Sequence, residues 1–292
     1  MNNFEQYIIK KYNYEGQKWL HNLPNVISQM ADKYHLSNLK PVSNLSINYV
    51  MTGQQKDLLV IVKLNLDHKD LKQEAMALRN LPKPSVPKII AEEDGMLLME
   101  RIIPGMNLKE YMNIQTEEIK NSNKRIEICC RLMEQIHKNH IESNDCNFPR
   151  VEDQFAALDR EWTDLPALYL DSARKLKNKL LKSLQEKQIP LVLLHGDLHY
   201  ENILLAESAN NQVWLAIDPK GVIGYPINEV WASIMDIEKD SIHIAEYFGF
   251  DLWEVRKWYF VHLMLASCWS IEDKSNPERF LNLAAVAFDF IQ

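Results

Sequence analysis

The chain has 292 residues, 46% of them hydrophobic and 25% charged, which is typical of a globular protein large enough for two domains or two lobes. Glycine is scarce: there are 8, about 3%, where about 7% is usual. No two of them have the spacing of a Rossmann G-x-G-x-x-G fingerprint or of a Walker A loop, so both of these nucleotide-binding loops are excluded.

Charge and hydropathy exclude further classes. The net charge of −7 argues against a nucleic-acid-binding surface. No apolar run approaches the roughly 18 residues that span a bilayer, and the first residues lack the apolar core of a signal peptide. The four cysteines form no C-x-x-C pair. We therefore expect a cytoplasmic protein with reduced thiols, no membrane segment and no nucleic-acid partner.

Charge is distributed unevenly along the chain. Residues 1–103 carry a net charge of +2, whereas residues 104–292 carry −9. An acidic second half favours a cationic small molecule, because a cleft focuses the potential of the charges that line it. The same imbalance is also compatible with an ordinary acidic protein surface.

The first hundred residues have the pattern of a small β-rich lobe. Apolar residues at three- to four-residue intervals from Trp19 to Tyr34 predict a helix, which Pro24 breaks or restarts. The pattern that follows predicts, in chain order, a strand at 45–49, a turn at 52–54, a strand at 58–63, a helix at 68–80, and strands at 88–91 and 96–100.

The best boundary between two lobes follows Ile103, before a Pro-Gly pair. Residues 1–103 then form an N-terminal lobe, and residues 104–292 form a larger and mainly helical C-terminal lobe. In the second lobe we expect helices at 117–140, 151–161, 166–187 and from 226 to the end, and a small β island at 191–194, 203–205 and 213–217. The fold class is α+β.

The most informative segment joins two predicted strands of the β island. It contains Asp197 and Asn202 at the D-x-x-x-x-N spacing of a kinase catalytic loop. There the carboxylate deprotonates a hydroxyl, and the amide oxygen binds a magnesium ion held by the nucleotide. Asp218 ends the next strand, as a second magnesium ligand does, and Pro219 after it predicts a stiff loop. The histidines nearby lack a zinc-binding pattern.

The N-terminal lobe offers the remaining parts of a nucleotide site. Lys63 ends a buried strand, as a phosphate-binding lysine does, and Glu74 on the next helix can pair with it. Main-chain groups at Glu100 and Ile102 are candidates for contacts with adenine. Taken singly, Lys63 is most often a surface residue at a strand end, and Glu74 a solvated helix residue. What favours phosphotransfer is the order of all these residues along the chain.

These motifs resemble those of the aminoglycoside phosphotransferase family, whose fold is like that of protein kinases. The resemblance rests on H-G-D-L-H-Y-E-N-I-L at 195–204 and A-I-D-P-K-G at 216–221. Residues 213–224, together with W-S-I-E-D at 269–273, are similar to the streptomycin 6-kinase group, also called aminoglycoside/hydroxyurea antibiotic resistance kinases. The resemblance implies a two-lobed kinase-like fold.

The resemblance also implies transfer of the γ-phosphate of ATP, with Mg²⁺, to a hydroxyl group. It assigns Asp197 as the catalytic base, Asn202 and Asp218 as magnesium ligands, and Lys63 with Glu74 as the phosphate clamp. His195 would shape the loop without taking part in the chemistry.

One stretch departs from the family pattern. Related kinases have a glycine pair in the turn between the first two strands, where this chain has Asn44-Leu45 within residues 42–49. Asparagine tolerates left-handed backbone conformations but leucine does not, so the shape of this turn is in question. Ser46 with its amide is the candidate phosphate contact there.

We expect substrate contacts from acidic and aromatic residues of the second lobe. Glu229 and Asp236 lie seven residues apart, on one face of a predicted helix. Trp269, Glu272 and Asp273 lie near the end of a long helix. Acids beside an aromatic wall suit a cationic acceptor. It is equally open that Glu229 is a capping or packing residue and that 272–273 is a solvated turn.

The sequence thus predicts an ATP- and Mg²⁺-dependent small-molecule O-kinase with a hydroxylated, cationic acceptor of the aminoglycoside or hydroxyurea kind. Within the fold, the alternative is a kinase of another hydroxylated metabolite, such as choline, homoserine or a methylthio-sugar. From a different class, the alternative is a protein that binds nucleotide without turnover.

Overall fold

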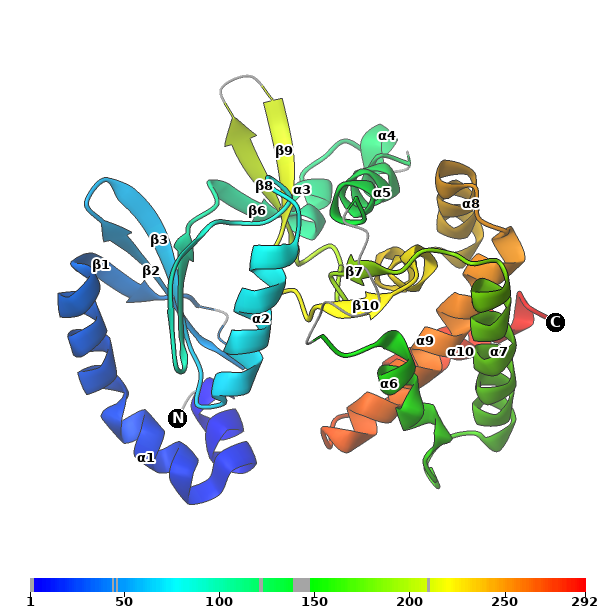
Figure 1. Cartoon of the computed structure of the whole chain (residues 1–292), viewed down its shortest axis with the longest axis horizontal. Helices are drawn as coiled ribbons and strands as arrows, with labels where there is room; N and C mark the ends of the chain where they lie inside the picture. The colour runs from blue at the N-terminus through cyan, green and yellow to red at the C-terminus, as the bar shows by residue number, and fades with distance from the viewer. Residues whose placement is uncertain (1–2, 44, 46, 121–122, 139–147, 209–210) are drawn as a thin grey trace.

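The computed structural model describes residues 3–43, 45, 47–120, 123–138, 148–208 and 211–292. Two lobes lie side by side in Figure 1: a sheet flanked by helices α1 and α2, and a larger lobe that is mainly helical. This arrangement confirms the predicted α+β, two-lobed fold. None of the helices in these ranges is both long and apolar enough to cross a membrane.

The N-terminal lobe is built on a five-stranded antiparallel sheet in the order β1-β2-β3-β5-β4. Helix α1 (Asn3–Tyr34) covers one face of the sheet and α2 (His68–Asn80) covers the other. The strands are β1 (Leu36–Pro41), β2 (Tyr49–Gln55), β3 (Leu58–Leu64), β4 (Ile89–Glu93) and β5 (Met96–Glu100). The helix predicted at 68–80 is confirmed.

Alternation of side chains along the two central strands explains why both faces are covered. One set packs against α1 and consists of Val60, Val62, Leu64, Met96 and Leu98, with Leu23 and Met30 from the helix. The alternate residues of β5, Leu97 and Met99, pack in the cluster that contains α2. Because neighbouring residues of a strand point to opposite faces, Lys63 points to the α2 side.

Three predictions for this lobe are wrong. The turn expected at 52–54 lies inside β2, and the chain turns at Lys56-Asp57 instead. A Cβ on Gly53 would lie 2.6 Å from Leu39 Cδ2, so this glycine allows β1 to lie close to β2. The strand expected at 45–49 belongs mainly to the connection before β2. Helix α1 is kinked at Asn13, which has φ 53°, and not at Pro24.

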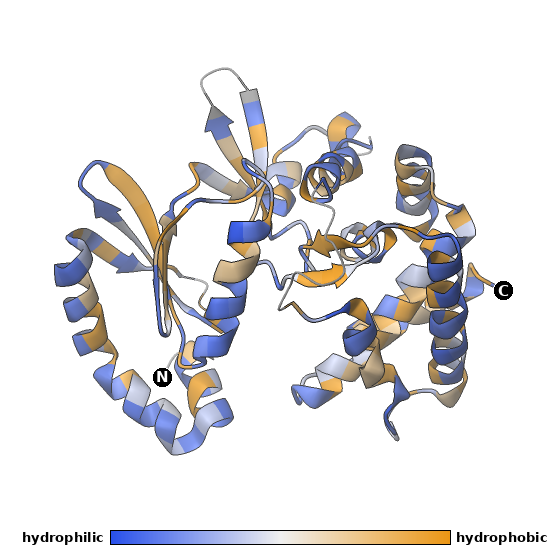
Figure 2. Ribbon diagram, in the orientation of Figure 1, coloured by the Kyte–Doolittle hydropathy of each residue, from blue (hydrophilic) through white to orange (hydrophobic). Residues whose placement is uncertain are grey.

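The C-terminal lobe contains two small sheets. The predicted lobe boundary after Ile103 falls between β5 and β6. One sheet has the order β6-β8-β9 and the other pairs β10 with β7. Their strands are β6 (Pro104–Asn107), β7 (Val192–Leu194), β8 (Ile203–Ser208), β9 (Asn211–Ala216) and β10 (Val222–Gly224). Strands β7 and β10 stand out as strongly hydrophobic in Figure 2. The sequence analysis did not predict β6 and β10.

Helix α9 forms the centre of this lobe, and α7, α8 and α10 pack against it. The helices are α3 (Leu108–Asn113), α4 (Glu117–Lys120), α5 (Lys124–Ile136), α6 (Val151–Phe155), α7 (Ala167–Glu186), α8 (Ile237–Phe248), α9 (Leu252–Glu272) and α10 (Glu278–Asp289). Short 3-10 turns are η1 (Ala156–Asp159), η2 (Pro226–Asn228) and η3 (Val230–Ser233). The helix expected at 166–187 is confirmed, whereas residues 117–140 contain α4 and α5 and residues 151–161 contain α6 and η1.

The two lobes also touch away from the chain link at 101–103. Ser85, which is 1% exposed and lies between α2 and β4, accepts a hydrogen bond through its carbonyl from the Ala216 amide at 2.7 Å. Gln73 of α2 donates its side-chain amide to the Lys220 carbonyl at 2.7 Å. These contacts hold β9 and the loop after it against the N-terminal lobe.

We predict that Leu98→Ala destabilises the protein by about 2–5 kcal/mol, because it leaves a cavity in the packed face between the sheet and α1. Chemical denaturation measures this loss. Leu168→Ala is the matched control: Leu168 is 64% exposed, so its removal should change the free energy of unfolding by less than about 0.5 kcal/mol. Equal losses for the two variants would contradict this packing.

Candidate active site

The loop between β7 and β8 runs from His195 to Asn202. Gly196 has φ 83°, and a Cβ there would lie 3.0 Å from Val222 Cγ2 of β10, so glycine permits the tight turn. The side-chain amide of Asn202 donates to the Asp197 carbonyl at 3.0 Å and closes the loop. Asp197 and Asn202 therefore lie together, and the Asp197 carboxylate, 36% exposed, is accessible to solvent.

His195 ties this loop to the next one. Its Nε2 donates to the Ile217 carbonyl at 2.8 Å, and its Nδ1 accepts from the Asp197 amide at 3.3 Å. Both bonds suit a neutral ring, and burial lowers the pKa of His195 below its ordinary value. The His195 carbonyl accepts from the amides of Lys220 and Gly221. The residue fixes where Asp218 lies relative to Asp197.

Glu229 is buried against the β7–β8 loop and does not face solvent. Its carboxylate accepts hydrogen bonds from the amides of His195 at 2.6 Å and Gly196 at 2.9 Å, and the side chain is 1% exposed. Burial opposes its charge, but the nearby His137 ring, 3.6 Å away, and the Gly196 amide outweigh burial and lower the pKa of Glu229. Both oxygens of Glu229 are thus occupied by the protein, as in the capping or packing alternative.

Two further residues support the loop, and sequence reasoning missed both. The Ser233 hydroxyl of η3 donates to the Leu198 carbonyl at 3.1 Å. Arg125 of α5 donates to the Ser233 carbonyl at 2.8 Å and to the Asp240 carboxylate at 2.5 Å. The segment from Glu229 to Ser233 therefore lies against the β7–β8 loop and holds it by hydrogen bonds from both of its ends. No local pattern marks these residues, because each contact joins distant parts of the chain.

Lys63, Glu74 and Asp218 meet in one ion-pair cluster. The Lys63 ammonium lies 2.7 Å from a Glu74 oxygen and also pairs with Asp218. The Lys63 and Glu74 side chains are almost fully buried, whereas that of Asp218 is 39% exposed. Asp218 has φ 60°, a left-handed conformation that turns its side chain at the end of β9. Residues from β3, α2 and the second lobe thus converge.

The opposite charges in this cluster offset the cost of removing them from water. Burial alone would lower the pKa of Lys63, but Asp218 and then Glu74 outweigh it and raise the pKa above the ordinary value. Burial likewise opposes the charge of Asp218, yet the Lys63 ammonium lowers the pKa of that carboxyl. At Glu74, burial prevails and raises the pKa. The Lys63 ammonium therefore lies between two carboxylates that both contact it.

The residues expected to contact adenine lie on the link between the lobes. The Glu100 amide donates to the Lys88 carbonyl at 3.0 Å, which leaves its carbonyl as the group that could serve a ligand. The neighbouring Arg101 amide donates to the Leu59 carbonyl at 2.9 Å, and Ile102 is half-buried. Ser46, the expected phosphate contact, lies outside the described residues.

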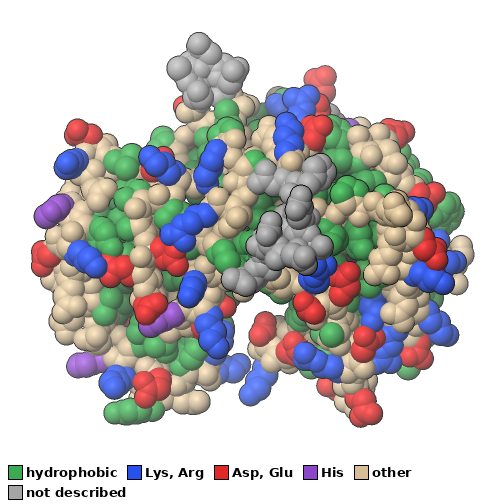
Figure 3. Space-filling model, in the orientation of Figure 1, with side chains coloured by type: hydrophobic (Ala, Val, Ile, Leu, Met, Phe, Trp, Pro, Cys, Tyr) green, Lys and Arg blue, Asp and Glu red, His purple; other side chains and the backbone are tan. Residues whose placement is uncertain are grey.

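The other expected substrate residues are dispersed. Asp236 is the N-cap of α8 and accepts from the amides of Glu238 and Lys239. Trp269 is half-buried against the core, Glu272 pairs with Arg160 of the second lobe, and Asp273 is exposed at the C-cap of α9. In Figure 3, acidic side chains are interspersed with basic ones over both lobes, so the negative charge of residues 104–292 forms no single patch on the face shown.

The donor atoms near Asp197 suit a magnesium ion. The Asn202 amide nitrogen is engaged with the Asp197 carbonyl, which leaves its Oδ1 as a ligand, and the partly exposed Asp218 offers carboxylate oxygen. A hard cation prefers oxygen ligands, and Mg²⁺ on a nucleotide needs only one or two protein groups. In the part of the chain that the structure describes, no group of three or more His, Cys, Asp or Glu side chains could hold a metal alone.

An aromatic cluster lies behind η3. Trp231 and His262 stack in parallel with their ring centroids 5.4 Å apart, and Phe155 stacks on Trp258 at 5.3 Å. His262 is also 5.1 Å from Phe155 and 6.0 Å from Trp258. Burial lowers the pKa of His262 to about 3, so the ring is neutral in the folded protein at physiological pH. This cluster fixes η3, and with it Ser233.

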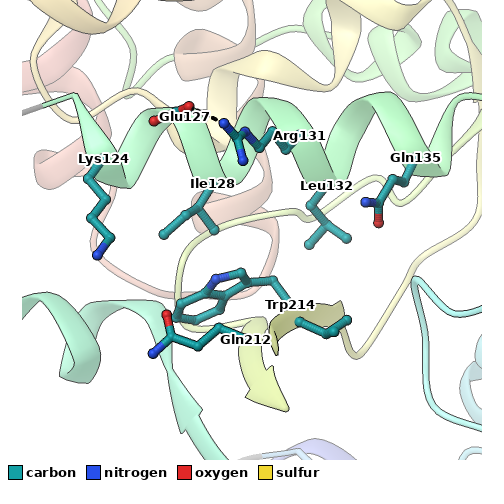
Figure 4. Close-up of a pocket in the computed structure, with 9 residues that line it drawn as sticks. Lys124, Glu127, Ile128, Arg131, Leu132, Gln135, Gln212 and Trp214 are labelled. Atoms are coloured by element: carbon teal, nitrogen blue, oxygen red, sulfur yellow. Dashed lines mark hydrogen bonds and ion pairs between the residues drawn. The ribbon is translucent and has the colours of Figure 1, made fainter. Parts of the chain in front are cut away.

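A hollow of about 340 Å³ lies between α5 and β9 (Figure 4). Trp214 lies across it, facing Ile128 and Leu132 of α5. In the β8–β9 pairing, Trp214 lies opposite Leu205, so both point to the α5 side. None of the expected site residues lines the hollow. It is therefore separate from the cluster around Asp218.

We predict that Glu229→Gln lowers the free energy of unfolding by about 1–3 kcal/mol, because an amide nitrogen then faces a buried backbone donor. Thermal and chemical denaturation measure the loss. Glu186→Gln, on the exposed side of α7, is the control and should leave stability nearly unchanged. If the two variants are equally stable, Glu229 does not hold the loop.

We predict that His262→Phe flattens the acid dependence of stability. An unfolded histidine takes up a proton below pH 6.5, whereas the folded one stays neutral down to about pH 3. Its contribution is therefore fully present above pH 6.5 and is lost as the pH falls, by at most about 1.4 kcal/mol per pH unit. Urea denaturation from pH 7 to pH 4 should show a shallower decline for the variant; parallel declines would contradict a neutral, buried His262.

Comparison with known proteins identifies the fold. The choline kinase LicA from Streptococcus pneumoniae matches with a TM-score of 0.64 at 13% identity, over 91% of this chain and 98% of that chain. Aminoglycoside phosphotransferase APH(4)-Ia, in a ternary complex with ADP and hygromycin B, matches with a TM-score of 0.59 at 12% identity, over 90% and 96%. These similarities show that the two-lobed fold is kinase-like.

Sequence comparison identifies the family. Streptomycin 6-kinase from Streptomyces glaucescens is 22% identical over 289 residues, which cover 89% of this chain and 87% of the relative. Residues 59–234, more than half of the chain, match the family model for aminoglycoside/hydroxyurea antibiotic resistance kinases. The chain belongs to this family of kinases and is a phosphotransferase that acts on an alcohol group.

Proposed function

We propose that this protein transfers the γ-phosphate of ATP, with Mg²⁺, to a hydroxyl group of a streptomycin-like or hydroxyurea-like acceptor. The observation that carries the proposal is the buried ion-pair cluster. It holds Lys63 and Glu74 of one lobe against Asp218 of the other, next to the loop that carries Asp197 and Asn202.

Lys63 binds the α- and β-phosphates of the nucleotide. Its ammonium is already fixed by Glu74, so little side-chain entropy is lost when phosphate oxygens approach. The pairing with Asp218 also places the ammonium beside the metal ligand. Binding of the nucleotide therefore inserts anionic oxygens between groups that the fold has already positioned.

Asn202 and Asp218 hold the metal through side-chain oxygens. When bound, Mg²⁺ neutralises the charge that develops on the β- and γ-phosphates. The two protein ligands are kept in register by the bond from the Ile217 amide to the Asn202 carbonyl at 2.9 Å and by His195, which binds the Ile217 carbonyl. Their relative position depends on main-chain hydrogen bonds between the two loops.

Asp197 takes the proton of the acceptor hydroxyl. Its carboxylate is accessible, and its carbonyl and amide are fixed by Asn202 and by the His195 ring. A positioned carboxylate orients the attacking oxygen and accepts its proton as the bond to phosphorus forms.

Relatives support the choice of acceptor. Two of them are streptomycin 6-kinases, so streptomycin is the first acceptor to test and hydroxyurea the second. The acids expected to bind a cationic acceptor are partly engaged elsewhere, since Glu229 supports the loop and Glu272 pairs with Arg160. The exposed Asp273 is the acid that this proposal still assigns to the acceptor.

We predict that Asp197→Asn lowers kcat by about 10²–10⁴-fold, because the acceptor loses its general base. Asp218→Asn should abolish turnover and weaken Mg-ATP binding, because it removes a metal ligand and a partner of Lys63. ATP consumption with streptomycin, hydroxyurea, choline and homoserine measures these effects, and product mass locates the added phosphate.

Asp57→Asn, in the exposed turn after β2, is the matched control and should keep wild-type kinetics. Undiminished turnover by both the Asp197 and the Asp218 variants would refute the mechanism. Turnover of choline or homoserine in preference to streptomycin would refute the proposed acceptor and leave the phosphotransfer chemistry standing. Mg-ATP binding without turnover on any acceptor would favour a non-catalytic protein.

A further inference from the structure

The first arm of α1 folds back on the second. We call residues 3–19 the hook. Its bend is at Asn13, with φ 53° and ψ −124°. At Gly16 a Cβ would lie 2.6 Å from the Ile8 carbonyl oxygen, so the backbones of the two arms are in contact. Ile8 is fully buried. The hook, dark blue in Figure 1, is therefore a packed unit and not a loose end.

The hook reaches the start of β2 through Phe4. This ring is 2% exposed and lies 5.6 Å from the Tyr49 ring and 6.3 Å from the Trp19 ring. Tyr49 is the first residue of β2, directly after the β1–β2 connection. In the sheet, the next residue, Val50, pairs with Lys63. Phe4 thus packs against the strand end next to the phosphate-binding lysine.

A second contact fixes the same strand end from the other side. The buried Asn65 donates its side-chain amide to Asn48 Oδ1 at 2.7 Å and accepts from the Asp67 amide at 2.8 Å. Asp67 is the N-cap of α2, the helix that carries Glu74. Burial raises the pKa of the Tyr12 hydroxyl in the hook, and the Asp67 carboxylate acts in the same direction.

These contacts matter because the β1–β2 connection has no glycine. A glycine-rich turn can fold its amides closely around phosphates, and the sequence of residues 42–48 (V-S-N-L-S-I-N) contains no glycine. The position of a connection without glycine therefore depends on the contacts made by the residues at its end. Phe4 and Asn65 hold that end, at Tyr49 and Asn48, beside Lys63.

We propose that the hook is a positioning element for the nucleotide phosphates, with Phe4 as its principal positioning residue. The inference rests on the proposed function, because it takes Lys63 to be the phosphate ligand. The hook sets the position of the Asn48-Tyr49 strand end beside Lys63, and we assign it no part in binding the base or the acceptor.

The test is calorimetric binding of Mg-ATP and of adenosine, which has no phosphates. Phe4→Ala should raise the Kd for Mg-ATP about three- to tenfold, in keeping with the loss of an aromatic contact, and leave the Kd for adenosine unchanged. Asn48→Ala should act in the same direction through the other contact. Phe4→Tyr keeps the ring and should restore wild-type affinity.

Leu23→Ala is the matched control, since Leu23 is buried against the sheet from the other arm of α1. It should lower the unfolding temperature and leave both dissociation constants as in the wild type. If Phe4→Ala and Asn48→Ala leave Mg-ATP affinity unchanged, or weaken adenosine binding equally, the hook has no role at the phosphates.

The binding measurements distinguish failure of the proposed phosphotransfer activity from failure of the hook proposal. A wild-type protein that binds Mg-ATP but phosphorylates no acceptor would refute the phosphotransfer proposal, and the ratio of the two dissociation constants would still decide the role of the hook. A wild-type protein that binds adenosine and Mg-ATP with the same affinity would overturn the hook proposal, because Lys63 would then hold no phosphate.

Discussion

The arrangement of the whole site depends on a buried ammonium group. Lys63 lies where water cannot solvate it, so its charge must be balanced by carboxylates. One of these, Glu74, comes from the same lobe, and the other, Asp218, comes from the opposite lobe. Loss of Lys63 would leave both carboxylates without their common partner, and breaking a buried ion pair in this way costs several kcal/mol. The ion pairs thus set the position of α2 relative to the β9 loop.

The second lobe contains a buried charge of the opposite sign, which must also be balanced. Glu229 is a buried carboxylate whose balance comes from backbone amides and a nearby histidine ring. A carboxylate that accepts two amide hydrogen bonds can remain charged inside a protein. Both loops that carry candidate catalytic groups are therefore held by buried charge.

Features that depend on neighbouring residues in the sequence could be predicted, whereas contacts between residues far apart in the chain could not. The helix at 68–80 could be predicted because its apolar face is a local pattern, and Lys63 and Glu74 could be proposed as a pair because their order is that of a known chemistry. The pairing of Lys63 with Asp218 was not predicted. The turn at 52–54 could not be predicted correctly. Gly53 was taken as a turn residue, but it makes room for Leu39 of the neighbouring strand.

The supporting residues escaped sequence reasoning for a related reason. Ser233, Arg125 and His137 have ordinary helical surroundings, and their partners lie far away in the chain. Glu229 was named both as a candidate substrate contact and as a capping or packing residue, because helical spacing says which face a residue occupies and not what that face meets.

The bond between the Ser85 carbonyl and the Ala216 amide has a mechanical consequence. Together with the chain link at 101–103, the Gln73–Lys220 bond and the Lys63–Asp218 pair, it attaches the lobes to each other at several separate places. A movement of one lobe against the other must therefore stretch or break at least one of these contacts, and the loss of a buried hydrogen bond is costly. We expect the two lobes to move as one body unless these contacts are released.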